Sequence, residues 1–226
     1  EGRCGGMVPG TGIACRGAAD SVKLFCRDDP SALTRIHVDR GSRTSVALLT
    51  ILMRELYSTA PELRPVEPTA EMTLARGEGV LIIGDRCFAY ERARAAAGRP
   101  SIIGHDLGRM WRDWTGLPFV FAVWAMAPDF VEHADRSAVA GLCDLLTESR
   151  DRGLERLDEL AARAADRGQL GVGGEASIAA IARYFRHSLR YVLEEPEMAG
   201  LRRFHELCRK HGLTSAPGPL RFIART

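Results

Sequence analysis

The chain has 226 residues, of which 46% are hydrophobic and 27% are charged, which excludes a disordered chain, a collagen-like repeat and a disulfide-dense miniprotein. Its net charge is +2, with 31 basic and 29 acidic residues interspersed, so no basic face for nucleic acid is indicated. The longest apolar run, Leu117–Ala127, is far shorter than the roughly 20 residues that span a bilayer.

The first half of the chain alternates short apolar runs with amphipathic stretches. Val80–Ile83 is fully apolar and precedes a glycine, as in a parallel strand buried on both faces. The expected strands are Arg35–Val38, Leu63–Val66, Val80–Ile83, Ser101–Ile103 and Leu117–Met126. The expected helices are Ser45–Leu56, Thr69–Ala75, Arg86–Ala97 and Arg109–Trp114. Strands that alternate with helices predict an α/β domain with a mostly parallel sheet.

After Pro128 the pattern becomes helical. The expected helices are Ser137–Arg150, Leu154–Arg167, Ala176–His187 and Pro196–Lys210. The last of them has a proline in its first turn and Gly212 after its end, which are common signals of helix boundaries. Leu220–Ile223 is the one strand expected in this half. Because the pattern changes at Leu117–Met126, we expect that strand to connect two lobes.

Hydroxyl side chains surround the predicted start of the first helix. Ser42, Thr44 and Ser45 follow Gly41 just after a strand. A helix start offers backbone N–H groups without intrahelical partners and a partial positive charge, so this segment is a candidate site for a carboxylate or phosphate. The alternative is that Ser42 or Thr44 only caps the helix. Arg43 either strengthens the anion site or faces water.

Gly84 and Asp85 follow the buried strand Val80–Ile83. Ligands of open α/β sheets bind beyond the carboxyl ends of strands, and a glycine there lets a ligand approach the backbone. Asp85 either accepts a hydrogen bond from a substrate hydroxyl or caps the next helix, and the cap is the more common role.

His105 and Asp106 also follow a strand. A histidine beside a carboxylate suggests acid–base chemistry, but a loop pair without chemistry is the interpretation we favour, because only spatial contact makes such a pair functional. Aromatic residues that are typical of a core follow, namely Trp111, Trp114, Phe119, Phe121 and Trp124. One face of the strand Leu117–Met126 is a candidate pocket wall.

Signatures of metal and nucleotide sites are missing from the sequence. The six cysteines form no CxxC pair and no Cys/His cluster with metal-ligand spacing, so we expect most of them to be buried thiols and no metal to be bound. No GxGxxG at a strand–helix turn, Walker loop, HExxH or GxSxG is found. The residues therefore indicate a two-lobed α/β protein for a small, anionic ligand.

A tryptophan-rich motif carries a family resemblance. Asp106–Ala125, DLGRMWRDWTGLPFVFAVWA, closely resembles the signature of chorismate dehydratases of the futalosine route to menaquinone. Gly41–Leu49 resembles the family segment S-x-T-S-x-x-L-L, and Leu81–Asp85 resembles L-L-I-G-D. Gly12–Ala14 with Ser21 and Val22, and Ser149–Asp151 with Gly153 and Leu154, add further matches.

The resemblance implies a periplasmic-binding-protein-like fold of type 2, in which two lobes are joined by two crossover strands and the ligand lies between them. Residues 1–27 would hold a remnant of lobe 1 and the first crossover strand, Ser21–Cys26. Residues 28–117 would form lobe 2. Residues 118–226 would hold the second crossover strand and the helical return to lobe 1. We expect the chain to lack an N-terminal segment that family members carry, including an asparagine that faces the substrate, and Cys15 stands where the family usually has serine.

The implied reaction is loss of water from chorismate to give 3-[(1-carboxyvinyl)oxy]benzoate, without a cofactor or metal. We expect Ser21, Ser42, Thr44, Ser45 and Gly84 to bind the substrate, with Thr44, Ser45 and Ser21 on its carboxylates. Asp85 is the expected catalytic residue at the ring or the leaving hydroxyl. The substrate's own side-chain carboxylate is a candidate base.

Two other functions remain open. One is a non-catalytic protein of the same fold that binds a small carboxylate. The other is the sister enzyme dihydroxynaphthoate synthase, which carries a histidine base at the position aligned with Gly84, so Gly84 speaks against it. We expect a cytoplasmic monomer or weak homodimer that binds chorismate and neither nucleic acid nor membrane.

Overall fold

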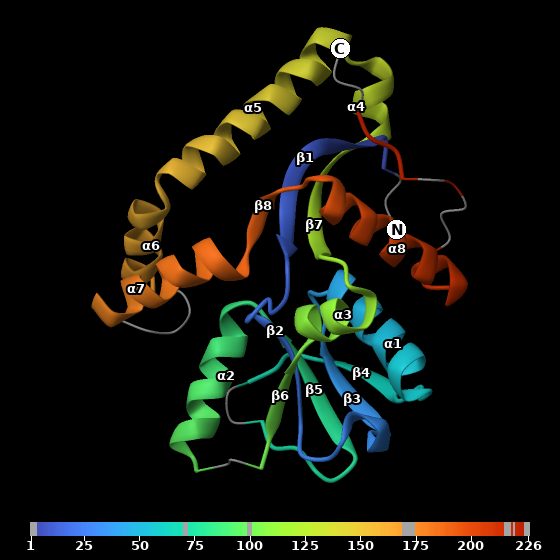
Figure 1. Ribbon diagram of the computed structural model, residues 1–226, viewed down its shortest axis with the longest axis vertical. Coiled ribbons are helices and arrows are strands. Elements are labelled where there is room, and N and C mark those ends of the chain that lie inside the picture. The colour runs from blue at the N-terminus through green and yellow to red at the C-terminus, as the bar shows by residue number, and fades with distance from the viewer. Residues whose placement is uncertain are drawn as a thin grey trace.

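Two β-sheets, each covered by helices, organise the chain (Figure 1). The structure, a computed structural model, describes residues 4–69, 72–98, 101–168, 175–214, 218 and 220–223. One sheet has five strands in the order β4–β3–β5–β2–β6, and the other has three in the order β7–β1–β8. The two sheets form separate lobes, so the two-lobed α/β class expected from the sequence is confirmed.

The five-stranded sheet is of mixed orientation. Its strands are β2 (Val22–Cys26), β3 (Arg35–Asp39), β4 (Glu62–Val66), β5 (Glu78–Ile83) and β6 (Ile103–Asp106). β3 runs parallel to β4 and β5, whereas β2 runs antiparallel to β5 and β6. The prediction of a mostly parallel sheet was therefore wrong. The apolar run of β5 reflects burial on both faces and is independent of strand direction.

Helices cover both faces of this sheet because its side chains alternate between them. Leu24 and Leu81 pack against α1 (Thr44–Tyr57) and α3 (Leu107–Thr115) on one face. Phe25 and its neighbours pack against α2 (Asp85–Ala96) on the other. The first cluster is the larger core, and it also receives residues of the last helix, α8 (Glu195–Lys210).

The three-stranded sheet is antiparallel throughout. It consists of β1 (Gly6–Cys15), β7 (Phe119–Met126) and β8 (Arg190–Val192). The pairing of β1 with β7 contains two register shifts. This sheet brings together the start, the middle and the end of the chain. Neither β8 nor the full length of β1 was predicted from the sequence.

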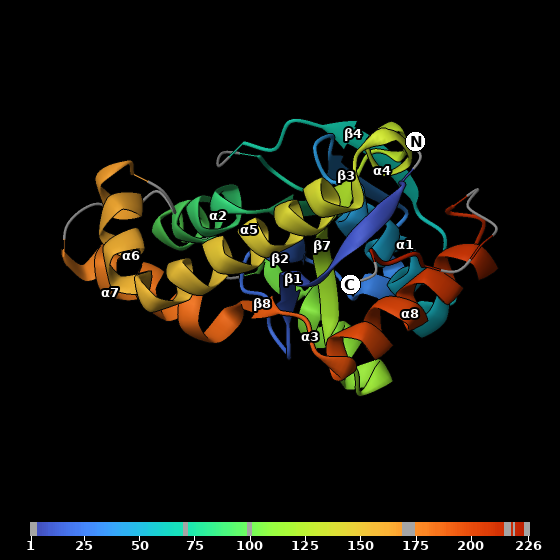
Figure 2. The ribbon, with the colours of Figure 1, turned by 90° about the horizontal axis from the view of Figure 1, so that it is seen from above.

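The C-terminal half is helical, as expected. Its helices are α4 (Pro128–His133), α5 (Arg136–Glu155), α6 (Leu157–Asp166), α7 (Glu175–Arg183), a π-helical turn η3 (Tyr184–Ser188) and α8. Seen from above, α6 and α7 lie at one end of the molecule and α8 at the other (Figure 2). Small residues of α6 and α7 pack together around Ala161 and Ile181.

Three local predictions were wrong. Residues 69 and 72–75 are not helical in the described part of Thr69–Ala75, and residues 70–71 lie outside it. The strand expected over Ser101–Ile103 begins at Ile103 instead. Leu220–Ile223 contributes a single bridge between Phe222 and Met7 in place of a strand.

The chain passes between the lobes twice, at residues 16–21 and at residues 116–118. Both passages lie at the starts of the segments expected to be crossover strands. β2 itself belongs to the five-stranded sheet, and β7 belongs to the three-stranded sheet. The division into residues 1–27, 28–117 and 118–226 stays a prediction.

Candidate functional site

A cavity of about 290 Å³ lies where the two lobes meet, and all five residues expected to bind the substrate line it. These are Ser21, Ser42, Thr44, Ser45 and Gly84. They come from the start of β2, the start of α1 and the end of β5. Ile13, Phe121, Tyr184 and Leu189 close the cavity from the other lobe. The fold therefore brings three separate sequence motifs into one site.

The start of α1 leaves several hydrogen-bonding groups open to this cavity. Arg43 is the N-cap residue, and no side chain caps the helix, so the capping interpretation of Ser42 and Thr44 was wrong. Ala47 is the first residue whose N–H bonds to a carbonyl of the helix, to Arg43 at 3.0 Å. Within the described residues, the hydroxyls of Ser42, Thr44 and Ser45 have no hydrogen-bond partner, although Ser42 and Ser45 are buried. Open N–H and hydroxyl donors at a helix start are suited to an anion.

Asp39 fixes the loop that leads into α1. Its carboxylate accepts a hydrogen bond from the N–H of Gly41 at 2.9 Å, and its carbonyl accepts one from Ser42 at 3.2 Å. The other carboxylate oxygen pairs with Arg86 of α2 at 3.3 Å. This contact ties the starts of α1 and α2 together. Arg43 also lines the cavity, and its exposed side chain makes no ion pair with any residue that the structure describes.

Gly84 joins β5 to α2 in a conformation that favours glycine. It is the N-cap of α2, with φ 64° and ψ −147°, and a side chain there would meet no atom within 4 Å. Its N–H donates to the carbonyl of Ser21 at 2.7 Å, which places the end of β5 against the start of β2. Asp85, the first residue of α2, is exposed and is not among the residues that line the cavity. Its catalytic role stays a prediction.

Tyr184 is a polar residue of the site that sequence reasoning missed. Its hydroxyl lies 2.8 Å from that of Ser21, and it lines the cavity from η3. Burial raises the pKa of Tyr184, and the carboxylates of Asp85 and Asp20 raise it further against the opposing effect of the Ser21 hydrogen bond. Its ring packs edge-on against Phe88 of α2, with centroids 5.3 Å apart.

His105 and Asp106 lie in the strand β6, so the expectation that they form a loop pair was wrong, and Asp106 has a structural role. Its carboxylate accepts hydrogen bonds from the N–H groups of Ala19, Asp20 and Arg109, the last as the N-cap of α3. His105 is its neighbour on the strand β6, so its side chain points to the other face of the sheet. Burial lowers the pKa of His105.

A second, larger cavity adjoins the first. It has a volume of about 860 Å³ and lies between β1, β7 and the helices α5 and α6. Ile13, Tyr184 and Leu189 line both cavities. The walls are mostly apolar and include Trp124, which is 54% exposed. The expectation that one face of β7 forms a pocket wall is therefore confirmed for Trp124, whereas Phe119 is buried in the core.

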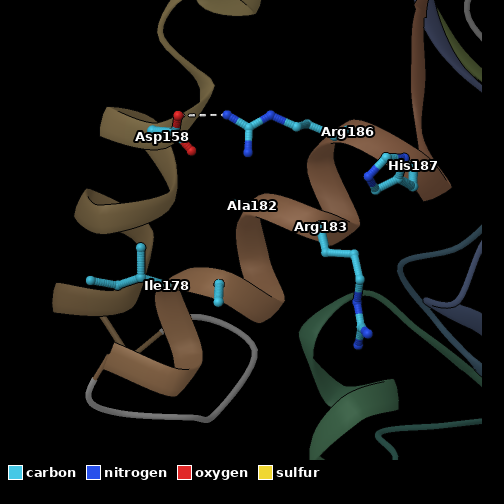
Figure 3. Close-up of a pocket in the computed structure, with 7 residues that line it drawn as sticks. Asp158, Ile178, Ala182, Arg183, Arg186 and His187 are labelled. Carbon is cyan, nitrogen blue, oxygen red and sulfur yellow. Dashed lines mark ion pairs between the residues drawn. The ribbon is translucent and has the colours of Figure 1, made fainter.

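A third cavity, of about 530 Å³, lies between α6, α7 and η3 (Figure 3). Arg186 pairs there with Asp158 at 2.6 Å, while Arg183 reaches toward α2 (Figure 3). Both arginines are exposed, and none of the residues singled out from the sequence lies in this cavity. The cavity that holds the sequence motifs is therefore the better candidate site.

Over the ranges that the structure covers, no cluster of three or more metal-ligating side chains is present. The six cysteines are free thiols, and burial raises the pKa of Cys15, next to the passage between lobes, to about 12. None of the described helices is both long and apolar enough to cross a bilayer.

The sequence and the structure were compared with known proteins. A profile of a menaquinone biosynthesis family matches residues 6–210. A chorismate dehydratase of Thermus thermophilus is 35% identical over 222 residues, which cover 94% of this chain and 75% of that protein. A crystal structure of a protein from Archaeoglobus fulgidus aligns with a TM-score of 0.46 and 15% identity, over 92% of this chain and 73% of the other.

Proposed function

The chain belongs to the menaquinone biosynthesis family, and we propose that it removes water from chorismate to form 3-[(1-carboxyvinyl)oxy]benzoate. The observation that carries this proposal is the cavity between the lobes, which is lined by Thr44 and Ser45 at a helix start with open N–H groups. Such a site suits a small carboxylate, and the Thermus thermophilus relative is named for this reaction.

The reaction demands little acid–base machinery. The ring C–H next to the enol ether is acidified through the conjugated ring carboxylate. When this bond breaks, its electron pair forms the third double bond of the ring, and the C–O bond of the neighbouring hydroxyl breaks. Because the product is aromatic, the step is strongly downhill. The protein mainly has to hold a dianion, exclude water and polarise the leaving hydroxyl.

The start of α1 is the proposed place for a substrate carboxylate. Thr44 and Ser45 would donate their hydroxyl hydrogens, and the first N–H groups of the helix would donate alongside them. Gly84 would line the ring face, since nothing lies above it within 4 Å. Asp85 stays the proposed polar residue near the hydroxyl, and the substrate's own side-chain carboxylate is the proposed base. The resemblance to chorismate dehydratases also supports the proposal that the protein is a cytoplasmic monomer or weak homodimer and needs no cofactor.

Incubation with chorismate tests the proposal. We expect the diene absorbance to be replaced by that of an aromatic product, with one water lost per substrate by mass spectrometry. The double variant Thr44→Val/Ser45→Ala should bind chorismate at least about tenfold more weakly, because two hydrogen bonds to a charged group are lost. Ser137→Ala, an exposed position on α5, is the matched control and should behave like the wild type.

Two results would count against the proposal. Binding of chorismate with the diene intact would identify a non-catalytic binding protein. Unchanged affinity in the double variant would remove Thr44 and Ser45 from the site. Dihydroxynaphthoate synthase activity is disfavoured by Gly84, which stands where that enzyme has its histidine base.

A further inference from the structure

Two hydroxyl groups meet at one end of the cavity. The hydroxyl oxygens of Tyr184 and Ser21 lie 2.8 Å apart, although the residues are 163 positions apart in the sequence. Both side chains line the cavity. Tyr184 also lines the larger neighbouring cavity, so it stands on the boundary between the two spaces. Nothing in the family motifs found in the sequence includes Tyr184.

The pair has a hydrogen to spare for a ligand. One hydroxyl hydrogen is used in the bond between the two oxygens, whichever residue donates it. If Ser21 donates, the hydrogen of Tyr184 is left over. If Tyr184 donates, the hydrogen of Ser21 has only the carbonyl of Ala19 at 3.4 Å, which is at the long limit of a hydrogen bond. A ligand oxygen in the cavity is therefore a better acceptor than the protein offers.

The charges around the pair favour a neutral ligand group. The carboxylates of Asp85 and Asp20 act on Tyr184 and, together with burial, keep its hydroxyl protonated. The start of α1 is different, because it carries open N–H groups, and Arg43, whose exposed side chain makes no ion pair with the described residues, adjoins it. The strand order β3–β5–β2 separates the two places by two strand spacings, or roughly 10 Å. One end of the cavity thus has the partial positive charge of a helix start, and the other has a neutral, hydrogen-donating pair of hydroxyls.

Along its ring axis the substrate presents a carboxylate at one end and a hydroxyl at the other, and its side-chain carboxylate is attached through the carbon beside the hydroxyl. In chorismate the ring carboxylate and the departing hydroxyl occupy opposite positions of the ring. Resting on the proposed function, we propose that Tyr184, together with Ser21, holds the departing hydroxyl of chorismate while the ring carboxylate binds at the start of α1. This assigns Ser21 to the hydroxyl end of the substrate instead of a carboxylate.

Tyr184 then acts by donating a hydrogen bond and keeps its own proton. As the ring C–H bond breaks, its electron pair enters the ring and the C–O bond releases its electron pair to the oxygen. That oxygen gains charge, and the bond from Tyr184 or Ser21 strengthens accordingly. The proton removed by the substrate's carboxylate completes the water molecule.

The variant Tyr184→Phe tests this assignment. The ring keeps its packing against Phe88 and Phe185, so the fold is retained, and the thermal unfolding midpoint checks it. Tyr191→Phe is the matched control, because this second partly buried tyrosine lines the larger cavity but not the smaller one. We expect Tyr184→Phe to lower kcat/KM for chorismate about tenfold or more, mostly in kcat. The product has lost the hydroxyl, so its dissociation constant should change less than about twofold.

The outcomes separate this proposal from the proposed function. Equal kcat/KM in Tyr184→Phe and the wild type, or a parallel loss of product affinity, would overturn the role of Tyr184. If the wild type binds chorismate without dehydrating it, the proposed function fails. Weaker binding of chorismate with unchanged binding of the product would even then assign the hydroxyl contact to Tyr184. A wild type that binds neither compound would overturn both proposals.

Discussion

The carboxylate of Asp106 accepts a hydrogen bond from the backbone N–H of Asp20 at 2.7 Å, which joins the start of α3 to the passage between the lobes. Its other oxygen accepts from Ala19 and Arg109, each at 3.0 Å. Asp20 has a left-handed backbone conformation with φ 62°, and its carboxylate accepts a hydrogen bond from the hydroxyl of Ser188. The carboxylates of Asp106 and Asp20 therefore fix the segment that carries Ser21, the first to α3 and the second to η3.

Replacement of Asp106 tests the importance of this junction. Asp106→Ala removes three hydrogen bonds to backbone N–H groups, one of them a helix cap, so we expect the free energy of unfolding to fall by about 3 kcal/mol. Asp135→Ala is the matched control, since Asp135 is the N-cap of α5 but makes no capping bond. Denaturant titration compares the two. Equal losses for both variants would show that the bonds of Asp106 contribute nothing beyond a generic cap position.

Gly84 provides a test of backbone strain at the site. At φ 64° and ψ −147° an alanine is strained even though its Cβ would meet no atom, so Gly84→Ala should cost about 1–3 kcal/mol. Gly141→Ala, in the middle of α5 and equally unobstructed, should instead stabilise the protein by about 0.5–1 kcal/mol. Opposite signs of the two changes are the expected result. A neutral Gly84→Ala would contradict the strained conformation.

Glu197 predicts a pH dependence of stability. Its side chain is fully buried and pairs with Arg16 at 2.6 Å. Burial raises the pKa of Glu197, but hydrogen bonds from Arg16 and from backbone N–H groups lower it by more, so the net pKa lies below the ordinary value of 4.5. The unfolded chain therefore binds the proton first. This contribution to stability is present above about pH 4.5 and is lost as the pH falls through the folded pKa.

The variant Glu197→Gln isolates this contribution. At neutral pH it should lower the free energy of unfolding by about 2 kcal/mol, because Arg16 loses its buried partner. The slope of stability against pH below about 4.5 should become shallower than in the wild type. Glu195→Gln breaks an exposed pair with Arg202 and should change neither quantity measurably. A slope unaffected by Glu197→Gln would assign the acid sensitivity to other carboxylates.

Arg43 predicts a salt-dependent contribution to ligand binding. Arg43 lines the cavity, and its exposed guanidinium has no ion-pair partner in the described parts of the chain, so it is available to an anion. Arg43→Ala should weaken chorismate binding about fivefold at low salt, and the difference should shrink as salt is added. Arg40→Ala is the control, because this exposed arginine lies in the same loop but does not line the cavity. Isothermal titration at two salt concentrations provides the measurement.

The candidate cavity was largely foreseeable because its motifs follow apolar strands. Ser42, Thr44 and Ser45 come directly after β3, and Gly84 comes directly after β5. These two strands are parallel neighbours, so their carboxyl ends meet at one edge of the sheet. Ser21 joined them only through the family resemblance. Its position depends on β2, which runs antiparallel to β5, and an apolar run does not encode strand direction.

Tyr184 was hidden by the regularity of its surroundings. The apolar spacing of Ala176–His187 predicts one continuous helix, whereas the chain changes to a π-helical turn at Tyr184. Local sequence does not reveal this change or the contact with Ser21 across the fold. β8 escaped prediction for a related reason: three residues are too few to show alternation, and the strand exists because β1 offers it an edge.

The passage between the lobes at residues 16–21 has a consequence for engineering. Within it, Ala19 and Ser21 line the cavity, and Arg16 forms an ion pair with α8. Asp20 is hydrogen-bonded to the N-cap residue of α3 and to η3. We therefore expect substitutions in this segment to change ligand affinity and thermal stability together. At the start of α1, by contrast, the hydroxyls of Thr44 and Ser45 make no bond that the described structure depends on, so substrate preference can be redesigned there with the scaffold left intact.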